Sequence, residues 1–159
     1  MTATNVKMSL KEITRANWRE ALTLSVTPEQ QRFVGDSIPV AAIALAKAYI
    51  RPDGLIWVPY AIYADNLLIG LTMLAYEPDS SDQYWIYHFF IDQRYQGKGF
   101  GTEALATLTG MIKNSFCTCQ VIQLTVHPEN VAAQKLYTRG GFAPTGKTLN
   151  GEPVYRLKV

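Results

Sequence analysis

The middle of the chain holds three apolar runs of β type in succession, and a glycine-rich turn follows the last of them. The runs Leu55–Tyr63 and Leu67–Ala75 are rich in β-branched and aromatic residues, and the turn residues Asp65 and Asn66 separate them. The third run, Tyr84–Ile91, is strongly aromatic. We expect an antiparallel meander whose last strand is central and buried on both faces, because a continuous apolar run favours that position.

The turn Gln96–Gly101 lies between the aromatic run and a segment whose apolar residues recur at helical spacing. Glycines let a backbone turn tightly and approach a ligand, and the free amides at the start of a helix favour an anion such as a pyrophosphate. Lys98 adds a cation nearby. A glycine-rich turn alone is equally typical of an ordinary connection between a strand and a helix.

The surroundings of this turn exclude two other nucleotide sites. A P-loop requires Ser or Thr directly after its Gly-Lys pair, whereas Gly97 and Lys98 are followed by Gly99. A dinucleotide-binding fold places its glycine turn after the first strand of a parallel sheet. In this chain an antiparallel meander precedes the glycine turn.

The remaining segments predict further strands and helices on both sides of the meander. Strands are expected at Val6–Ile13, at Val121–Val126, from Phe142 onward and at Val154–Val159, the last after an Asn150-Gly151 hairpin turn. Helices are expected after Thr14, from Thr27 towards Val34, from Pro39 to Tyr49, after Gly101 and after Asn130. We therefore expect one domain, residues 1–159, of the α+β (mixed α/β) class, with a largely antiparallel central sheet flanked by helices.

Composition and charge exclude several classes of protein. With 48% apolar and 18% charged residues, the chain is typical of a globular protein. The net charge of +2 and the scattered Lys and Arg residues argue against nucleic acid as a partner. The longest apolar stretch, Ile38–Ile50, is shorter than the roughly 20 residues of a membrane span. Met1–Lys11 lacks a signal core, so a cytoplasmic location is expected.

The two cysteines, Cys117 and Cys119, are separated by one residue and have no Cys or His cluster near them. We expect neither a disulfide framework nor a zinc site, and no metal elsewhere.

Two spaced motifs occupy the second half of the chain. Gln96, Gly99 and Gly101 have the spacing Q-x-x-G-x-G, and Asn130–Tyr137 followed by Gly141-Phe142 reads N-x-x-A-x-x-L-Y-x-x-x-G-F. Both are similar to motifs of the GNAT superfamily of acyl-CoA-dependent N-acetyltransferases. The resemblance runs from Val6 to the C-terminus and diverges in the helical region Thr27–Tyr49. It implies a GNAT-like acyl-CoA N-acyltransferase fold and acetyl-CoA as co-substrate. Members are often dimers, so a homodimer is expected, although no apolar stripe marks an interface.

The resemblance also implies which residues bind acetyl-CoA. The end of the aromatic strand would line the pantetheine arm at a bulge, the turn would hold the pyrophosphate, and Asn130 would hydrogen-bond the arm. The residues concerned are Phe89, Phe90, Ile91, Gln96, Gly97, Lys98, Gly99, Phe100, Gly101, Thr102 and Asn130. Tyr137 would face the sulfur, where its O–H could donate to the departing thiolate. Without the motif, Tyr137 reads as a core tyrosine on a helix face.

An ammonium has no lone pair with which to attack a thioester, so a side chain or water must accept its proton. The candidates by location are Glu77, Asp79, Asp82 and His88, and of these we single out Glu77 and His88 as catalytic candidates beside Tyr137. The acids equally suit a solvated loop. His88 alternates in phase with Tyr84, Ile86 and Phe90, so it equally suits a hydrogen-bonded core histidine.

The acceptor amine is suggested by a second likeness. Gln30–Val34, followed by an Ala-rich helix and the strand through Tyr84-Trp85-Ile86, resembles the spermine/spermidine branch of the superfamily. A polycation suits a cleft lined by carboxylates. The acidic side chains near these segments could line such a cleft, and they equally suit a dispersed surface. The substrate-binding candidates are Glu29, Asp36, Asp82 and Tyr84.

The expected function is acetyl transfer from acetyl-CoA to a primary amine such as spermidine or spermine, by direct attack in a ternary complex. The alternatives are an acetyltransferase for an antibiotic or peptide amine, and an acetyl-CoA-binding sensor without turnover.

Overall fold

The computed structural model describes residues 5–34 and 38–159. Its sheet has seven strands in the order β1-β2-β3-β4-β5-β7-β6. The strands are β1 Met8–Glu12, β2 Ile56–Ala64, β3 Leu67–Tyr76, β4 Tyr84–Ile91, β5 Val121–Thr125, β6 Ala143–Leu149 and β7 Glu152–Lys158. Neighbouring strands are antiparallel except for β4 and β5, which are parallel. The expected α+β class, with a largely antiparallel sheet, is confirmed.

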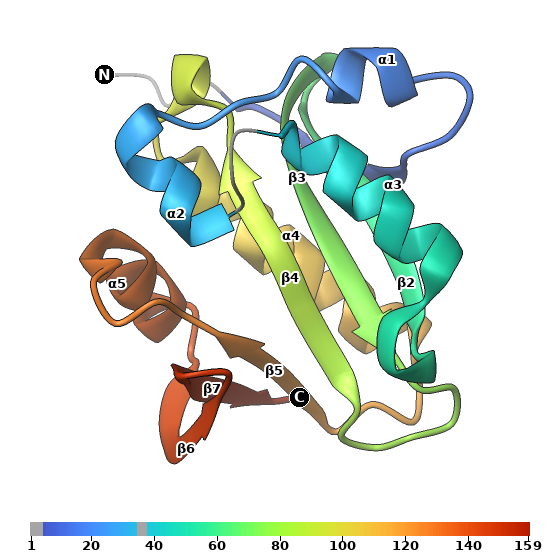
Figure 1. Ribbon diagram of the computed structural model, residues 1–159, viewed down its shortest axis with the longest axis vertical. Helices are drawn as coiled ribbons and strands as arrows, with labels where there is room; N and C mark the ends of the chain where they lie inside the picture. The colour runs from blue at the N-terminus through green and yellow to red at the C-terminus, as the bar shows by residue number, and fades with distance from the viewer. Residues whose placement is uncertain (1–4, 35–37) are drawn as a thin grey trace.

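Helices cover both faces of this sheet (Figure 1). They are α1 Trp18–Ala21, α2 Gln31–Val34, α3 Val40–Ile50, α4 Phe100–Ser115 and α5 Val131–Arg139, with short 3-10 turns at Pro28–Gln30, Pro52–Gly54 and Gln93–Tyr95. Ala41 and Ala44 of α3 belong to the core on one face, and Leu105 and Leu108 of α4 belong to the core on the other. Among the described residues, none of the helices is long and apolar enough to cross a membrane.

The meander of β2, β3 and β4 forms as the β-type runs predict, with β2 shifted by one residue towards the C-terminus and β3 one residue longer at its C-terminal end. The Asn150-Gly151 turn also forms, and it joins β6 to β7. Both turn residues have positive φ, 51° and 80°, which the tight two-residue hairpin loop requires.

A β-bulge interrupts β4 opposite Thr72 of β3. The flanking pairs are Leu71–Phe90 and Met73–Tyr87. Two residues of β4, His88 and Phe89, therefore lie opposite the single residue Thr72. His88 has a φ of 53°, which is uncommon for a residue other than glycine. The bulge, at His88 and Phe89, begins one residue before the range Phe89–Ile91 in which the family resemblance places it.

The bulge reverses the alternation of side chains along β4. Tyr84 and Ile86 belong to the core beneath α4, whereas Phe90 belongs to the core beneath α3. The expectation that His88 shares the face of Tyr84 and Ile86 is therefore wrong. One extra residue in the strand moves every later side chain to the opposite face of the sheet. His88 instead contacts Lys47 of α3.

Gly70 of β3 is required beside this bulge. A Cβ added there would lie 2.4 Å from the carbonyl oxygen of Phe90, which is closer than real Cβ atoms approach backbone. A glycine at this position therefore lets β3 run close to the irregular part of β4.

β4 and β5 separate soon after they meet. Their paired residues are Trp85 and Gln123, and Figure 1 shows the two strands diverging towards α2 and α5. Tyr87, His88 and Phe89 are only half-buried. The expectation that the third run is buried on both faces is therefore wrong, because the sheet opens along this strand and leaves space beside it.

Candidate functional site

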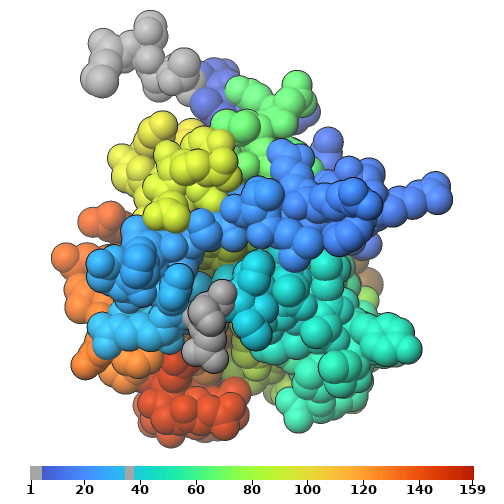
Figure 2. Space-filling view, turned by 45° about the horizontal axis from the view of Figure 1, so that its top comes forward, coloured from blue at the N-terminus to red at the C-terminus, as the bar shows by residue number. Residues whose placement is uncertain are grey.

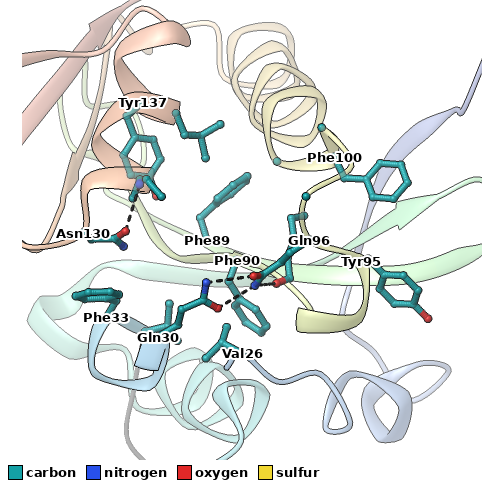
Figure 3. Close-up of a pocket in the computed structure, with 18 residues that line it drawn as sticks. Val26, Gln30, Phe33, Phe89, Phe90, Tyr95, Gln96, Phe100, Asn130 and Tyr137 are labelled. Carbon is teal, nitrogen blue, oxygen red and sulfur yellow. Dashed lines mark hydrogen bonds between the residues drawn. The ribbon is translucent and has the colours of Figure 1, made fainter. Parts of the chain in front are cut away.

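A cavity of about 290 Å3 lies where β4 ends and the glycine-rich turn begins. We call it the glycine-turn cavity, and Figure 3 shows its lining. Its wall combines the end of β4, the turn before α4, one face of α5 and the segment that leads into α2. The lining residues are Val26, Gln30, Phe33, Val34, Phe89, Phe90, Ile91, Tyr95, Gln96, Gly97, Gly99, Phe100, Gly101, Asn130, Ala132, Ala133, Leu136 and Tyr137.

The turn presents backbone amides to this cavity. Gly97 and Gly99 have φ of 75° and 83°, and a Cβ on either would have no heavy atom within 4 Å. Gly99 is the N-cap of α4 and has no side chain with which to cap it. The first amides of α4 are thus available to a ligand, and the helix dipole favours an anion there. The turn fits a pyrophosphate.

Gln96 holds the turn against the segment before α2. Its side-chain amide donates to the carbonyl oxygen of Ile91 (2.8 Å) and exchanges hydrogen bonds with the amide of Gln30 (2.9 and 3.1 Å). Gln30 also accepts from the backbone N–H of Thr27. The Thr27–Gln30 capping pattern predicts a helix start, but it does not reveal that Gln30 hydrogen-bonds to Gln96 at the cavity wall.

Asp92, at the end of β4, is a second anchor for the segment before α2. It is fully buried, and its carboxylate accepts from the backbone N–H of Ser25 (2.9 Å) and from the guanidinium of Arg94 (2.8 Å). Burial alone would raise the pKa of Asp92, but the hydrogen bonds from Arg94 and Ser25 outweigh it and lower that pKa. The anchor keeps the chain before α2 beside the end of β4.

Tyr137 of α5 faces the glycine-turn cavity with its ring packed edge-on against Phe89 and Phe142. The residue is only 7% exposed, and burial raises the pKa of its phenol. The phenol therefore stays protonated and can donate a proton or a hydrogen bond. Asn130, the N-cap of α5, accepts from the backbone N–H of Ala133, which leaves its amide N–H groups for a ligand.

A second cavity, of about 300 Å3, lies between β4, β5 and the turn of the β6–β7 hairpin. We call it the hairpin cavity. It is lined by Phe33, Val34, Ile86, Tyr87, His88, Phe89, Thr125, Val126, His127, Asn130, Ala133, Tyr137, Leu149, Asn150 and Glu152. Phe33, Val34, Phe89, Asn130, Ala133 and Tyr137 line both cavities. The two spaces therefore meet at Tyr137 and Phe89.

His88 lies in the wall of the hairpin cavity with both ring nitrogens engaged. Its Nδ1 lies 3.1 Å from the carbonyl oxygen of Val34, and its Nε2 lies 2.8 Å from Nζ of Lys47. Burial and the Lys47 ammonium lower the pKa of His88 to about 4, against the opposing hydrogen bond to Val34. The geometry fits a neutral ring that donates from Nδ1 and accepts at Nε2.

Helix α2 lies against the loop before α5 and covers the junction of the two cavities. The rings of Phe33 and His127 pack with centroids 5.1 Å apart, and Arg32 forms an ion pair with Glu129. Figure 2 shows α2 beside the orange segment that contains α5. Contacts between residues so far apart in the sequence carry no local pattern, so sequence reasoning does not find them.

The structure brings most of the predicted acetyl-CoA residues together. Phe89, Phe90, Ile91, Gln96, Gly97, Gly99, Phe100, Gly101 and Asn130 all line the glycine-turn cavity, with Tyr137. Lys98 on the turn and Thr102 in the first turn of α4 are exposed and do not line this cavity.

The predicted residues for the amine are more dispersed. His88 lines the hairpin cavity, whereas Glu77 lines a neighbouring depression that shares Tyr87 and Leu149 with it. Glu29 and Asp82 are exposed and line neither of the two cavities. Tyr84 is buried in the core and stacks on Tyr76. Asp36 lies outside the described residues.

Comparison with known proteins gives a consistent picture. Residues 10–142 match the model of the acetyltransferase (GNAT) family. The chain is 30% identical to the spermine/spermidine N(1)-acetyltransferase of Bacillus subtilis (strain 168), over 94% of this chain and 97% of that protein.

Solved structures share the fold. The spermidine N-acetyltransferase of Vibrio cholerae, in complex with CoA and spermine, superposes with a TM-score of 0.71 at 19% identity, over 96% of this chain and 94% of that one. An aminoglycoside acetyltransferase in complex with coenzyme A superposes with a TM-score of 0.74 at 18% identity, over 96% and 95%.

The family model covers most of the chain, and the relative from Bacillus subtilis matches nearly all of it. The chain belongs to the GNAT family of acetyltransferases.

Proposed function

We propose that this acetyltransferase transfers the acetyl group of acetyl-CoA to a primary amine by direct attack in a ternary complex, with a polyamine such as spermidine or spermine as acceptor. The observation that carries the proposal is the meeting of two cavities at Tyr137 and Phe89. One cavity suits the donor and the other leaves room for an amine on the opposite side of the reacting carbonyl.

The donor fits the glycine-turn cavity by its chemistry. The amides of Gly99 and the first turn of α4 would bind the pyrophosphate, and the apolar wall of Phe89–Ile91 would accommodate the pantetheine arm. Asn130 would donate to the arm from its free amide N–H groups. The bulge at His88–Phe89 leaves backbone groups of β4 outside the ladder, where they can bind the thioester carbonyl.

The chemical step needs one proton donated to sulfur and two removed from nitrogen. The ammonium first loses a proton to water, which frees the lone pair. The amine nitrogen then forms a bond to the thioester carbon while the carbon–sulfur bond breaks, and the Tyr137 O–H donates its proton to the departing sulfur. The second proton leaves the nitrogen as the amide forms, and through solvent it restores the Tyr137 phenol. His88 is poorly suited to accept that proton, because Lys47 already donates to its Nε2.

Two observations support a polyamine over other amines. The relative from Bacillus subtilis, named for spermine and spermidine, matches nearly the whole chain. The hairpin cavity also contains a carboxylate, Glu152, which suits a cation. The structural likeness to an aminoglycoside acetyltransferase keeps a bulkier polycationic acceptor as the second candidate.

The test is release of free thiol from acetyl-CoA in the presence of separate amines: spermidine, spermine, 1,4-diaminobutane, an aminoglycoside and a peptide with a free N-terminus. We expect the two polyamines to give the highest kcat/KM. A preference for the aminoglycoside or the peptide would replace the acceptor in this proposal. Tight acetyl-CoA binding without thiol release for any of them would refute amine acetylation.

A further inference from the structure

Glu152 is the one carboxylate among the described residues that line either cavity. It is the first residue of β7 and pairs with Leu149 across the Asn150-Gly151 turn. Of the acids suggested by the sequence, Glu29, Glu77 and Asp82 line neither cavity. Glu77 lines a neighbouring depression that shares Tyr87 and Leu149 with the hairpin cavity. The carboxylate inside the hairpin cavity therefore comes from the β6–β7 hairpin.

A hydrogen bond from β5 orients this carboxylate. The hydroxyl of Thr125 donates to Oε1 of Glu152 at 2.9 Å. Thr125 pairs with Val154 of the same strand as Glu152, so the ladder between β5 and β7 fixes the distance between the two side chains. No described residue donates to Oε2, and the side chain is half-buried at the cavity wall. One oxygen is therefore held by the protein and the other can receive a ligand.

The other titratable groups of the hairpin cavity do not neutralise Glu152. His88 is held neutral, because burial and Lys47 lower its pKa to about 4. Lys47 itself does not line the cavity. His127 accepts from the backbone N–H of Glu129 at Nδ1, which commits that nitrogen. Among the described side chains, no ion pair joins Glu152 to Lys or Arg.

We propose that Glu152 binds the distal ammonium of a diamine or polyamine whose reacting amine lies at the junction beside Tyr137. This inference rests on the proposed acetylation of polyamines. The cavity runs from Tyr137 and Phe89 at one end to Asn150 and Glu152 on the hairpin. An acceptor with two cations can occupy both ends, whereas a monoamine can occupy only one.

Two consequences follow for specificity. An ammonium bound by an oriented carboxylate gains a charge-assisted hydrogen bond that a monoamine of the same length lacks. The distance between the hairpin and α5 also sets which carbon-chain lengths reach both sites. Glu152 is thus a residue that determines specificity, and it does not take part in breaking the thioester.

The experiment measures binding of spermidine and of butylamine to the protein saturated with CoA, by calorimetry, for wild type and for Glu152→Gln. Glutamine keeps the size of the side chain and an oxygen that can accept from Thr125, whereas the charge and the second acceptor oxygen, which would bind the ammonium, are lost. We expect the Kd for spermidine to rise about 10- to 100-fold, in line with the loss of one hydrogen bond between charged groups. The Kd for butylamine should stay within about twofold of wild type.

Two further variants separate charge from structure. Glu20→Gln removes one negative charge from an exposed residue of α1 that lines neither cavity, and it should leave both Kd values unchanged. Glu152→Asp keeps the charge on a shorter side chain, so it should bind spermidine more tightly than Glu152→Gln does and favour longer diamines.

An unchanged spermidine Kd in Glu152→Gln would overturn the assignment of Glu152. If wild type still acetylates spermidine in that case, the proposed function stands and only this residue's role is lost. Equal weakening of spermidine and butylamine would also overturn it, because that outcome reports general damage to the cavity. If wild type neither binds nor acetylates spermidine, both the acceptor and the role of Glu152 are refuted.

Discussion

Nζ of Lys47 on α3 lies 2.8 Å from Nε2 of His88 on the bulge of β4. The same ammonium lies 5.0 Å from the ring centroid of Trp57 and 5.4 Å from that of Tyr87. The face of each ring attracts the ammonium through a cation–π interaction. Burial lowers the pKa of Lys47. Because the bond joins α3 to β4 at the bulge, it ties the wall of the hairpin cavity to the helix layer.

This pair predicts how stability depends on pH. His88 has a pKa of about 4 in the folded chain and an ordinary value of 6.5. As pH falls below that ordinary value, the unfolded chain binds a proton that the folded chain does not, so stability is lost progressively down to about pH 4. From about pH 7.5 to pH 4.5, His88 should contribute a loss of about 2–3 kcal/mol in the free energy of unfolding.

Urea denaturation across this range measures the effect. His88→Gln should flatten the pH dependence relative to wild type, whatever its absolute stability. Lys47→Met keeps the imidazole but removes the cation, so NMR titration should show a higher pKa for His88 in that variant. Identical pH slopes for wild type and His88→Gln would show that His88 carries no lowered pKa.

Tyr137→Phe tests the proton donor. The variant keeps the ring that packs on Phe89 and Phe142, so acetyl-CoA affinity should be unchanged. Turnover should fall by about 100-fold or more, the usual contribution of a general acid. Steady-state kinetics and a binding titration separate the two quantities.

The matched control is Tyr60→Phe on β2, a half-buried tyrosine that lines neither cavity. Its turnover should match wild type. Full activity of Tyr137→Phe would assign proton donation to water and leave Tyr137 a packing role.

Gly99→Ala tests the anion site at the glycine turn. A Cβ there would stand in open space beside the first amides of α4, and its φ of 83° is strained for alanine. Acetyl-CoA should bind at least about tenfold more weakly, since a ligand hydrogen bond to a charged group is lost.

Gly146→Ala on β6 is a close control, because Gly146 has a φ of 81° and equally open surroundings but lies away from the cavity. Both variants should lose about 1–2 kcal/mol of stability from the left-handed backbone. Only the first should weaken acetyl-CoA binding, and equal affinities in the two would refute the anion site.

The sequence predicts the meander and the glycine turn at the cavity well, because both depend on local patterns. The runs that become β2, β3 and β4 are continuous, and the turn Gln96–Gly101 follows directly. The bulge at His88 is different. It depends on how β3 and β4 register, and strict alternation places His88 on the wrong face.

Contacts between segments that are distant in sequence are the part that local patterns miss. Gln30 and Glu152 lie far from the glycine turn in sequence and reach the two cavities only through the packing of α2 and of the β6–β7 hairpin. The acids near the central strand, Glu77 and Asp82, looked suitable because of their position in the chain. The loop that holds them leads away from the junction of the cavities, so closeness in sequence is a poor guide there.

A pair of glycines tests how far the fold depends on the close approach of β3 to β4. In Gly70→Ala the added Cβ would lie 2.4 Å from the carbonyl oxygen of Phe90, so either strand must move. Forced overpacking of this kind costs about 1–3 kcal/mol. Because Phe90 and its neighbour Phe89 line the glycine-turn cavity, acetyl-CoA turnover should fall as well.

Gly110→Ala makes the same chemical change within α4, where the added Cβ meets no heavy atom within 4 Å. It should stabilise the chain by about 0.5–1 kcal/mol, since alanine favours the helix interior, and leave turnover unchanged. If the strands approach as closely as in the structure, thermal denaturation should show Gly70→Ala destabilised and Gly110→Ala stabilised. Thiol release should fall only in Gly70→Ala. A Gly70→Ala protein as stable and active as wild type would mean that β3 and β4 can separate without disturbing the bulge at His88 and Phe89.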